Sequence, residues 1–380
     1  MHSMMQTTIL PGNTTTTTTT ATTPAAITAS VLVIGAGPAG IAAAMTLARQ
    51  QHSVLLFGDG IYRNGRAQHS EHASLLQGQS PLLPGVDAGG ARAPSNFGPA
   101  ARDNMLAQHG AYVSYREATV VRVQRLGGHN DSSAAFVAVD NHGTQYTGRT
   151  VILASGVEEL LLPVDGYAAC FGRVLFPCLQ CAGYEQQPRG GRTRAGVLAV
   201  GAFAERRAAV AVHVARQAAS LVTEQVTIYT NRDAVLATAI RGAIPRGVMQ
   251  RTPAVAAAAA TATAPATATI TVESRAVNRF VFLGDHDHEL AGGASAHDAF
   301  LVHAPATRPR GPFIEQLSLA ATAEGDIWVQ LPDYRTSVPG VFAAGDNCAA
   351  RMKSVAHAML SGNVAGMGAG MQVSEGVGVL

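Results

Sequence analysis

The sequence predicts an α/β protein with two parallel-sheet domains, the second inserted into the first. Two segments carry this prediction, because each reads as a strand, a turn, a helix and a second strand. In the first, the apolar runs 31–34 and 54–57 flank an alanine-rich helical stretch. The second covers residues 195–232 and repeats the same order. Such a unit places its two strands parallel in one sheet, with the helix on a face of that sheet.

The composition is that of a folded protein and argues against several classes of partner. The chain has 380 residues, 47% hydrophobic and 14% charged, which suffices for two domains with their own cores. Its formal net charge of +2, without a basic stripe, gives no electrostatic basis for binding nucleic acid or an anionic membrane. Residues 1–27 form a threonine-rich leader that we expect to be disordered, and no window is apolar enough to span a membrane. With only four cysteines, the sequence predicts a soluble protein of a reducing compartment, the cytoplasm.

The turn of the first unit carries a glycine pattern typical of dinucleotide binding. Gly35, Gly37 and Gly40 make G-x-G-x-x-G, with Pro38 and Ala39 inside the pattern. The first glycine permits the tight turn from strand to helix, the second lets the backbone approach a pyrophosphate, and the third lets the helix pack close to the strand. The pyrophosphate is then held at the positive N-terminus of the helix. Because the pattern lies between a predicted strand and a predicted helix, we expect it to bind a dinucleotide.

The acid that usually binds the ribose is displaced from its place in this sequence. Counting from the glycine turn, the position at the end of the second strand holds Gly58, and Asp59 follows it. Asp59 is therefore one candidate for the ribose, and Arg63 and Asn64 are others. The alternative for Asp59 is a solvated turn residue, a position where aspartate is common.

Cys178 and Cys181 form a C-x-x-C pair that we assign to redox chemistry. A zinc site would need two further ligands at matching spacing, and the sequence has neither a second C-x-x-C nor an H-x-x-x-H segment. A disulfide that closes so short a loop adds little stability. At a helix N-terminus, by contrast, the helix dipole stabilises a thiolate and lowers its pKa. We therefore expect a redox pair and no metal; the alternative is a buried, inert pair.

The order of four segments resembles the low-molecular-weight thioredoxin reductase family of FAD-dependent disulfide oxidoreductases. These segments are GAGPAG, ASG, C-x-x-C and GVFAAGD, and the resemblance extends over residues 30–375. It implies two Rossmann-like domains: an FAD-binding domain of residues 28–160 and 308–380, and an inserted NAD(P)H-like domain of residues 161–307 that carries the cysteine pair. It also implies FAD as the cofactor and a homodimer as the assembly.

The resemblance implies roles for single residues as well. Asp346 matches the aspartate that binds the ribityl chain of the flavin, and residues 353–362 match the helix that presents its N-terminus to the flavin ring. Cys181 would face the flavin, whereas Cys178 would exchange with the external substrate. The other expected members of the cofactor site are Val120, Gly156, Gly345 and Val355.

The turn of the second unit departs from the reductases at the positions that would contact NADPH. It reads AVGAFAERRA, so that Gly201 is kept while Phe203 and Arg206 stand at the second and third glycine positions. A phenylalanine there blocks the close approach of backbone to pyrophosphate. After the next strand, Arg232 stands without the basic cluster that would bind a 2′-phosphate. Both features argue against NADPH.

Within the family, the sequence resembles the fungal dithiol oxidases of the gliotoxin type, which close disulfides in epidithiodioxopiperazines. The resemblance rests on YRNGRAQHSEH, CLQCAGYE, FLVHAPAT and VPGVFAAGDNCAARMKSVAHAMLSG. It implies that a small dithiol reduces the cysteine pair, that the pair reduces FAD, and that molecular oxygen accepts the electrons to give H2O2. Two alternatives remain: an NADPH-dependent disulfide reductase of the thioredoxin type, and a flavoprotein that sequesters a dithiol without turnover.

A catalytic base must come from outside the cysteine motif. Thioredoxin reductases carry an acid, and many relatives a histidine, directly after the second cysteine, but this chain has Ala182. His357, which the resemblance places near the flavin, is the first candidate. The others are His69, His72 and His303, and each has the alternative of a solvated or structurally hydrogen-bonded histidine.

Overall fold

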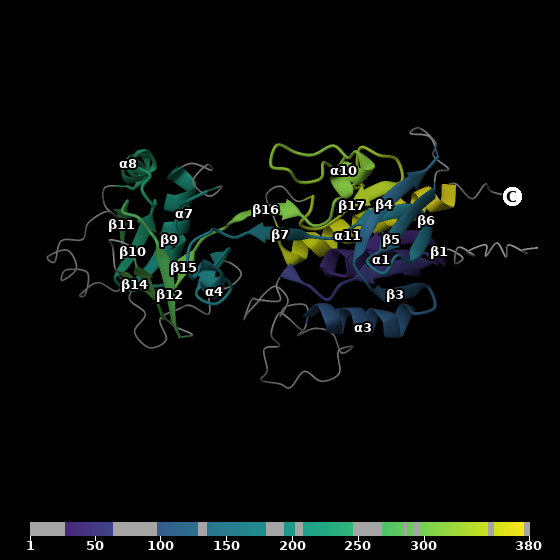
Figure 1. The fold of residues 1–380 in the computed structure, drawn as a ribbon, viewed down its shortest axis with the longest axis horizontal. Helices are drawn as coiled ribbons and strands as arrows, with labels where there is room; N and C mark the ends of the chain where they lie inside the picture. The colour runs from purple at the N-terminus through teal and green to yellow at the C-terminus, as the bar shows by residue number, and fades with distance from the viewer. Residues whose placement is uncertain are drawn as a thin grey trace, which may run out of the picture.

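The computed structural model describes residues 27–63, 97–127, 135–179, 194–201, 208–245, 268–284, 287–291, 296–348 and 353–375. These residues form two lobes, each built around a parallel β-sheet, with a pair of strands between the lobes (Figure 1). The predicted α/β class with two Rossmann-like units is confirmed, because each expected strand–helix–strand segment forms two neighbouring parallel strands.

The first lobe contains a parallel sheet, and its strands come from both ends of the described chain. Four strands run parallel in this spatial order: β3 (Val113–Glu117), β2 (Val54–Gly58), β1 (Ile27–Ile34) and β6 (Gln145–Leu153). β17 (Val341–Ala343) pairs parallel with the second half of β6, although the whole second lobe separates the two in the sequence. β4 (Val120–Leu126) and β5 (Ala135–Asp140) extend the sheet as antiparallel strands. The apolar run 31–33 in β1 is fully buried, as expected for a central strand covered on both faces.

Two helices of this lobe cross with their backbones in contact. α1 (Pro38–Arg49) joins β1 to β2, α3 (Phe97–His109) precedes β3, and α11 (Val355–Glu375) packs against α1. A side chain at Gly362 in α11 would collide with the carbonyl oxygen of Ala39 in α1. A Cβ at Gly366, about one turn further, would lie only 2.9 Å from the carbonyl oxygen of Ala43. The helix expected over residues 353–362 is thus the beginning of a longer helix held by small residues.

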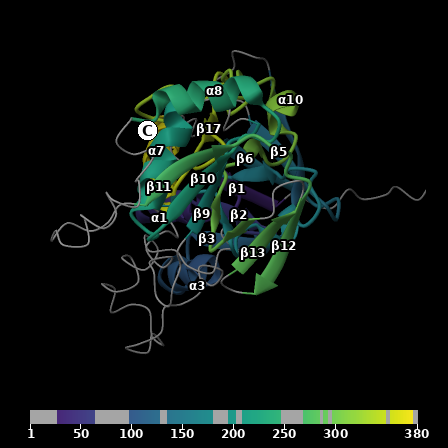
Figure 2. The same cartoon turned by 90° about the vertical axis from the view of Figure 1, so that its left-hand side faces the viewer.

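The second lobe contains a second parallel sheet. Its strands, in spatial order, are β11 (Thr269–Glu273), β10 (Gln225–Tyr229), β9 (Arg194–Leu198), β15 (Leu301–Val302) and β8 (Leu175–Phe176). The helices that the structure describes in this lobe are α4 (Tyr167–Cys170), α7 (Ala208–Ala219) and α8 (Ala234–Ala243). An antiparallel sheet of β12 (Arg279–Gly284), β13 (Asp287–Ala291) and β14 (Ala296–Asp298) completes it. Figure 2 faces this lobe, with α7 and α8 above its strands and β12 and β13 below.

A two-stranded antiparallel ribbon, which we call the neck, connects the lobes. It pairs β7 (Val157–Leu160) with β16 (Ala306–Pro309), after which the short helix α10 (Phe313–Leu317) returns to the first lobe (Figure 1). The chain therefore leaves and re-enters the first lobe through one ribbon. The domain boundaries at residues 160 and 308 stay a prediction.

None of the helices in the described part of the chain is both long enough and apolar enough to cross a membrane.

The helix crossing leads to a prediction about stability. Gly362→Val places a branched side chain where the carbonyl of Ala39 lies, so we expect it to lower the free energy of unfolding by roughly 1–3 kcal/mol. Chemical denaturation of the cofactor-free protein measures this. The matched control is Gly242→Ala in α8, where an added Cβ meets no atom within 4 Å and alanine favours the helix. Equal stability of Gly362→Val and the parent chain would contradict the backbone contact.

Candidate active site

The three glycines of the first turn have different surroundings, and the difference points to a ligand. Gly35 has φ +111°, and a Cβ there would lie 2.6 Å from the carbonyl carbon of Ala154. A Cβ at Gly40 would collide with the carbonyl oxygen of Gly35. At Gly37, the N-cap of α1, a Cβ would meet no protein atom within 4 Å. The fold itself therefore requires the first and third glycines, whereas the open space at Gly37 fits the close approach of a pyrophosphate to the N-terminus of α1.

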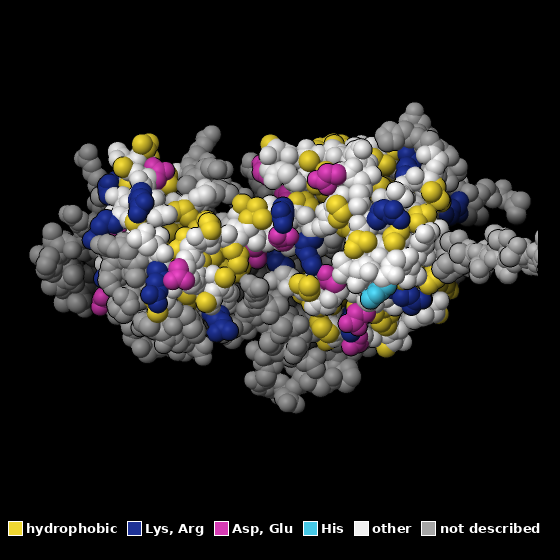
Figure 3. All heavy atoms as spheres, viewed as in Figure 1, with side chains coloured by type: hydrophobic (Ala, Val, Ile, Leu, Met, Phe, Trp, Pro, Cys, Tyr) yellow, Lys and Arg dark blue, Asp and Glu magenta, His cyan; other side chains and the backbone are white. Residues whose placement is uncertain are grey.

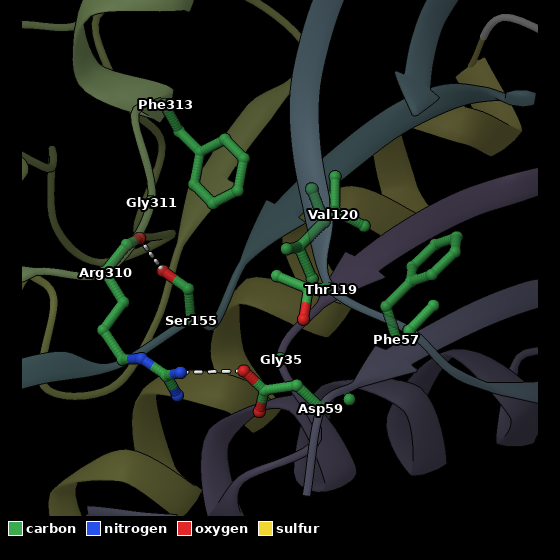
Figure 4. Close-up of a pocket in the computed structure, with 12 residues that line it drawn as sticks. Gly35, Phe57, Asp59, Thr119, Val120, Ser155, Arg310, Gly311 and Phe313 are labelled. Carbon is green, nitrogen blue, oxygen red and sulfur yellow. Dashed lines mark hydrogen bonds and ion pairs between the residues drawn. The ribbon is translucent and has the colours of Figure 1, made fainter. Parts of the chain in front are cut away.

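A pocket lies at the carboxyl ends of β1 and β2, beside this turn (Figure 4). Its cavity volume is about 90 Å³, and it is open to solvent on one side. It brings together Gly35, Asp59 and Val120, three residues that we predicted from distant parts of the sequence. The sequence reasoning missed several other lining residues: Ala118, Thr119, Ser155, Arg310, Gly311 and Phe313. The carboxyl edge of a parallel sheet is where open α/β folds bind ligands, so this pocket is the candidate cofactor site.

Asp59 is held by partners within the protein. Its Oδ2 accepts a hydrogen bond from Nη2 of Arg310 at 2.7 Å (Figure 4), and its Oδ1 accepts one from the backbone amide of Ile61 at 3.0 Å. At the preceding Gly58, a Cβ would lie 2.6 Å from the Cβ of Ala36 and about 3.1 Å from the Tyr115 hydroxyl. These neighbours exclude an acidic side chain from the usual position, and the acid follows one residue later. Asp59 thus faces the pocket as half of an ion pair.

Arg63, the other described candidate for the ribose, is engaged in two ion pairs. Its Nη1 donates to Oδ2 of Asp346 at 2.9 Å, and its Nε donates to Oε1 of Glu159 at 3.0 Å. Burial opposes the charge of the guanidinium, but the carboxylates of Asp346 and Glu159 outweigh this effect and raise the pKa of Arg63. Asn64 lies outside the described residues.

Asp346 keeps one oxygen available to a ligand. Its Oδ1 is buried and has no hydrogen-bond partner in the described part of the protein. A buried carboxylate oxygen in this condition is costly unless a donor reaches it. A hydroxyl of the flavin ribityl chain is a donor of this kind, so the orphaned oxygen fits the role that the resemblance implies for Asp346.

The segment around Asp346 is fixed next to the glycine turn. Gly345 has φ +86°, and a Cβ there would lie 2.9 Å from the Cβ of Ala39 at the start of α1. Its amide donates to Oγ of Ser361 in α11 at 2.9 Å. Val355 is the first residue of α11. The structure therefore gathers predicted cofactor residues from both ends of the chain.

Gly156 stands where the first sheet passes into the neck. It has φ +67°, and its carbonyl oxygen accepts a hydrogen bond from the amide of Arg310 at 3.0 Å. Ser155 donates from Oγ to the carbonyl oxygen of the same arginine at 2.9 Å. The two ends of the neck are thus tied together beside the pocket.

Cys178 lies in the second lobe, two residues beyond β8, and it is disulfide-bonded. Cys170 and Cys348 are free and buried, so neither is its partner. Burial raises the pKa of both free thiols, that of Cys348 to about 12, which keeps them protonated and unreactive at neutral pH. Cys181 lies outside the described residues.

Two of the four candidate histidines can be placed, and they differ. His303 is buried: the Tyr167 hydroxyl donates to its Nδ1 at 2.6 Å, and its Nε2 faces the carbonyl of Val200 at 3.3 Å. Burial lowers the pKa of His303 to about 4, so it is neutral at pH 7 and has the bonding of a structural histidine. His357, in the first turn of α11, has a buried Nε2 without a hydrogen-bond partner among the described residues. His69 and His72 lie outside those residues.

Of the second glycine turn, the structure describes Gly201 and the strands on either side of the turn. Gly201, with φ +57°, follows β9, and β9 and β10 are parallel neighbours. Beyond β10, Asn231 and Arg232 both have positive φ, and Asp233 caps α8 by accepting from the amide of Leu236 at 2.8 Å. Phe203 and Arg206 lie outside the described residues.

The open space at Gly37 leads to a prediction about cofactor binding. Gly37→Val should leave the stability of the cofactor-free protein within about 0.5 kcal/mol, because the new side chain meets no protein atom, yet it should abolish retention of the flavin. Absorbance of the purified protein near 450 nm and thermal unfolding of the apoprotein measure the two effects. Normal flavin content would refute the assignment of this turn.

Comparison with known proteins identifies the family to which the chain belongs. The family model described as pyridine nucleotide-disulphide oxidoreductase matches residues 29–362. Thioredoxin reductase tcpT of Claviceps purpurea is 32% identical over 345 residues, which cover 90% of this chain and 93% of the relative. A thioredoxin reductase of Gibberella zeae is 32% identical over 381 residues, covering 91% of this chain and 98% of the relative.

Solved structures show the same fold. An oxidoreductase from Agrobacterium tumefaciens has a TM-score of 0.65 at 25% identity, covering 92% of this chain and 99% of its own. Thioredoxin reductases of this family are FAD-binding flavoproteins, so the predicted cofactor and the predicted oxidoreductase class are confirmed. The chain belongs to the pyridine nucleotide-disulphide oxidoreductase family.

Proposed function

We propose that the protein is an FAD-dependent dithiol oxidase that forms a disulfide bond in a small-molecule secondary metabolite. The overall reaction takes two electrons and two protons from a dithiol and transfers them to molecular oxygen. One dithiol and one O2 give one disulfide and one H2O2, so atoms and electrons balance.

The altered second glycine turn is the observation that carries this proposal. The structure has the parallel strands β9 and β10 with α7 between them, which is the scaffold of a nucleotide site. Within that scaffold the second and third glycine positions hold Phe203 and Arg206. A pyrophosphate needs bare backbone at the second position. A flavoenzyme that cannot bind NADPH must receive its electrons from another donor, and a dithiol acting through the cysteine pair is that donor.

The disulfide at Cys178 is the group that would accept electrons from the substrate. In the proposed step, a substrate thiolate attacks Sγ of Cys178, and the sulfur of Cys181 leaves as a thiolate. The second substrate thiol then attacks the mixed disulfide, which releases the substrate as a disulfide and Cys178 as a thiol. FAD, when bound, supplies the two-electron acceptor between this cysteine pair and oxygen.

The residues of the first lobe would hold and orient the cofactor. The amides at the N-terminus of α1, left open by Gly37, suit the pyrophosphate. The free Oδ1 of Asp346 suits a ribityl hydroxyl. His357 is the described histidine with a buried, unpartnered ring nitrogen, and we propose that it serves as proton acceptor.

The alternative function is an NADPH-dependent disulfide reductase. The names of the fungal relatives, including thioredoxin reductase sirT of Leptosphaeria maculans at 31% identity, favour this alternative. The residues of the second turn favour the oxidase, and the two functions differ in one measurable property, the source of electrons.

The direction of electron flow can be measured directly. Under nitrogen, a small dithiol such as dithiothreitol should bleach the flavin, whereas NADPH at micromolar concentration should not. In air, the dithiol should consume one O2 and release one H2O2 per disulfide formed. Rapid bleaching of the flavin by NADPH would instead identify an NADPH-dependent reductase. Absence of oxygen uptake with the dithiol would identify a binding protein without turnover.

Variants of the cysteine pair test the order of the two thiols. Cys178→Ser should stop exchange with the substrate, whereas Cys181→Ser should trap a mixed disulfide on Cys178, visible as an added substrate mass. Cys170→Ala, a free buried thiol of the same lobe, is the matched control and should keep turnover. Substrate trapped on Cys181 in the Cys178→Ser variant would reverse the order.

We also propose a homodimer, with an apolar stripe on α11 as its contact surface. Leu360, Met367 and Met371 are 59%, 48% and 57% exposed, and their spacing places them on one face of the helix. Exposed apolar groups at this spacing are typical of a helix that packs against a partner.

Light scattering tests the dimer. Met367→Glu with Met371→Glu should shift the mass from dimer to monomer, because two carboxylates would be buried in an apolar contact. Val235→Glu on α8, at an 83% exposed position of the second lobe, is the control and should leave the mass unchanged. A monomer mass for the parent chain would end the proposal.

A further inference from the structure

We propose that Arg63 is a positioning residue of the cofactor site: it fixes the carboxylate of Asp346 for the flavin and ties it to Glu159 of the neck. The inference concerns the FAD site and does not depend on the direction of electron flow.

The guanidinium group of Arg63 contacts two carboxylates at once. Nη1 of Arg63 donates to Oδ2 of Asp346 at 2.9 Å, while Nε and Nη2 both lie 3.0 Å from Oε1 of Glu159. Separate nitrogen atoms therefore serve the two carboxylates. A planar guanidinium has this capacity, and a lysine ammonium, which acts as a compact point charge, reproduces it poorly.

The burial of this cluster distinguishes it from the other ion pair of the neck. The side chains of Arg63, Glu159 and Asp346 are 23%, 14% and 16% exposed. Arg308 and Glu158, which pair across the two neck strands, are 63% and 46% exposed. Charged side chains of both signs are visible on the surface between the lobes in Figure 3. Removal of one partner from an exposed pair has little effect, whereas in a sheltered pair it leaves an uncompensated charge, so loss of Arg63 affects its partners more than loss of Arg308 affects Glu158.

The remaining contacts of Asp346 leave one oxygen for a ligand. Its backbone carbonyl accepts a hydrogen bond from Nζ of Lys353 at 2.9 Å, and the same ammonium contacts Oδ2 of Asp326 at 2.7 Å. Oδ2 of Asp346 belongs to Arg63, and Oδ1 has no partner in the described part of the chain. Rotation of the carboxylate would break the contact with Arg63. The guanidinium therefore determines which oxygen the cofactor meets.

The ion pairs of Arg63 also connect the cofactor site to the neck. Arg63 follows β2, Glu159 lies in β7, and Asp346 follows β17. β7 leads from the first lobe to the lobe that contains Cys178. A movement of β7 would thus shift the carboxylate of Asp346, because the side chain of Arg63 connects the two.

The test is the affinity of the apoprotein for FAD, measured by quenching of flavin fluorescence. Arg63→Met should weaken binding by at least about tenfold, as expected when a charged hydrogen bond is lost. Arg63→Lys should recover only part of the loss. Arg308→Met, the matched control in the exposed neck pair, should bind FAD like the parent protein. Glu159→Gln should change the affinity by less than about threefold, because Arg63 keeps its bond to Asp346.

A double-mutant cycle separates positioning from general destabilisation. If Arg63 acts through Asp346, the Asp346→Asn and Arg63→Met effects on FAD affinity should be clearly less than additive. Full additivity, or parent-like affinity in Arg63→Met, would overturn the proposal. Should Arg63→Met fail to fold, the same cycle with Arg63→Lys decides, and full affinity in that variant would equally overturn it.

Discussion

The close approach of α1 to its neighbours is the constraint on which the first lobe depends. Gly35 and Gly40 lie against each other, with the backbone of residue 154 beside them, so the strand and the helix meet without intervening side chains. This contact places the N-terminus of α1 at the carboxyl edge of the sheet. α11 then reaches α1 because Gly362 leaves room for the carbonyl of Ala39. The cofactor site and the crossing of α1 with α11 thus both depend on glycines, which have no side chain.

Charged side chains around this turn connect segments that the backbone leaves apart. Asp59 pairs with Arg310, which follows the second neck strand, and Asp346 pairs with Arg63. Because a sheltered charge without a partner is costly, each pair fixes the relative position of its two segments. Two salt bridges therefore attach the neck to the cofactor site, one from Glu159 to Arg63 and one from Arg310 to Asp59. Among the described residues, the chain reaches the lobe with Cys178 only through the neck.

The two lobes show how little a shared scaffold says about chemistry. Both contain a strand, a turn, a helix and a parallel strand in the same order. In the first lobe the middle glycine faces open space, and in the second the corresponding position is Phe203. A single side chain at the turn decides whether backbone can contact a phosphate, so function follows from the residues of the turn and not from the fold.

The sequence by itself determined the features that depend on neighbours along the chain: the two strand–helix–strand units, the glycine spacing and the cysteine pair. Each of these features depends on residues close together in the sequence, so that hydrophobic periodicity and turn residues are sufficient to predict it. Only the tertiary structure decided which charges meet, because Asp59 and Arg310 are 251 positions apart and Arg63 and Asp346 are 283 apart. It also decided that the Tyr167 hydroxyl hydrogen-bonds to the ring of His303, and that Ala36 and Tyr115 together leave room only for glycine at position 58. The physical reason is that hydrogen bonds and steric exclusion act over a few ångströms, and strand pairing alone sets which distant residues come within that range.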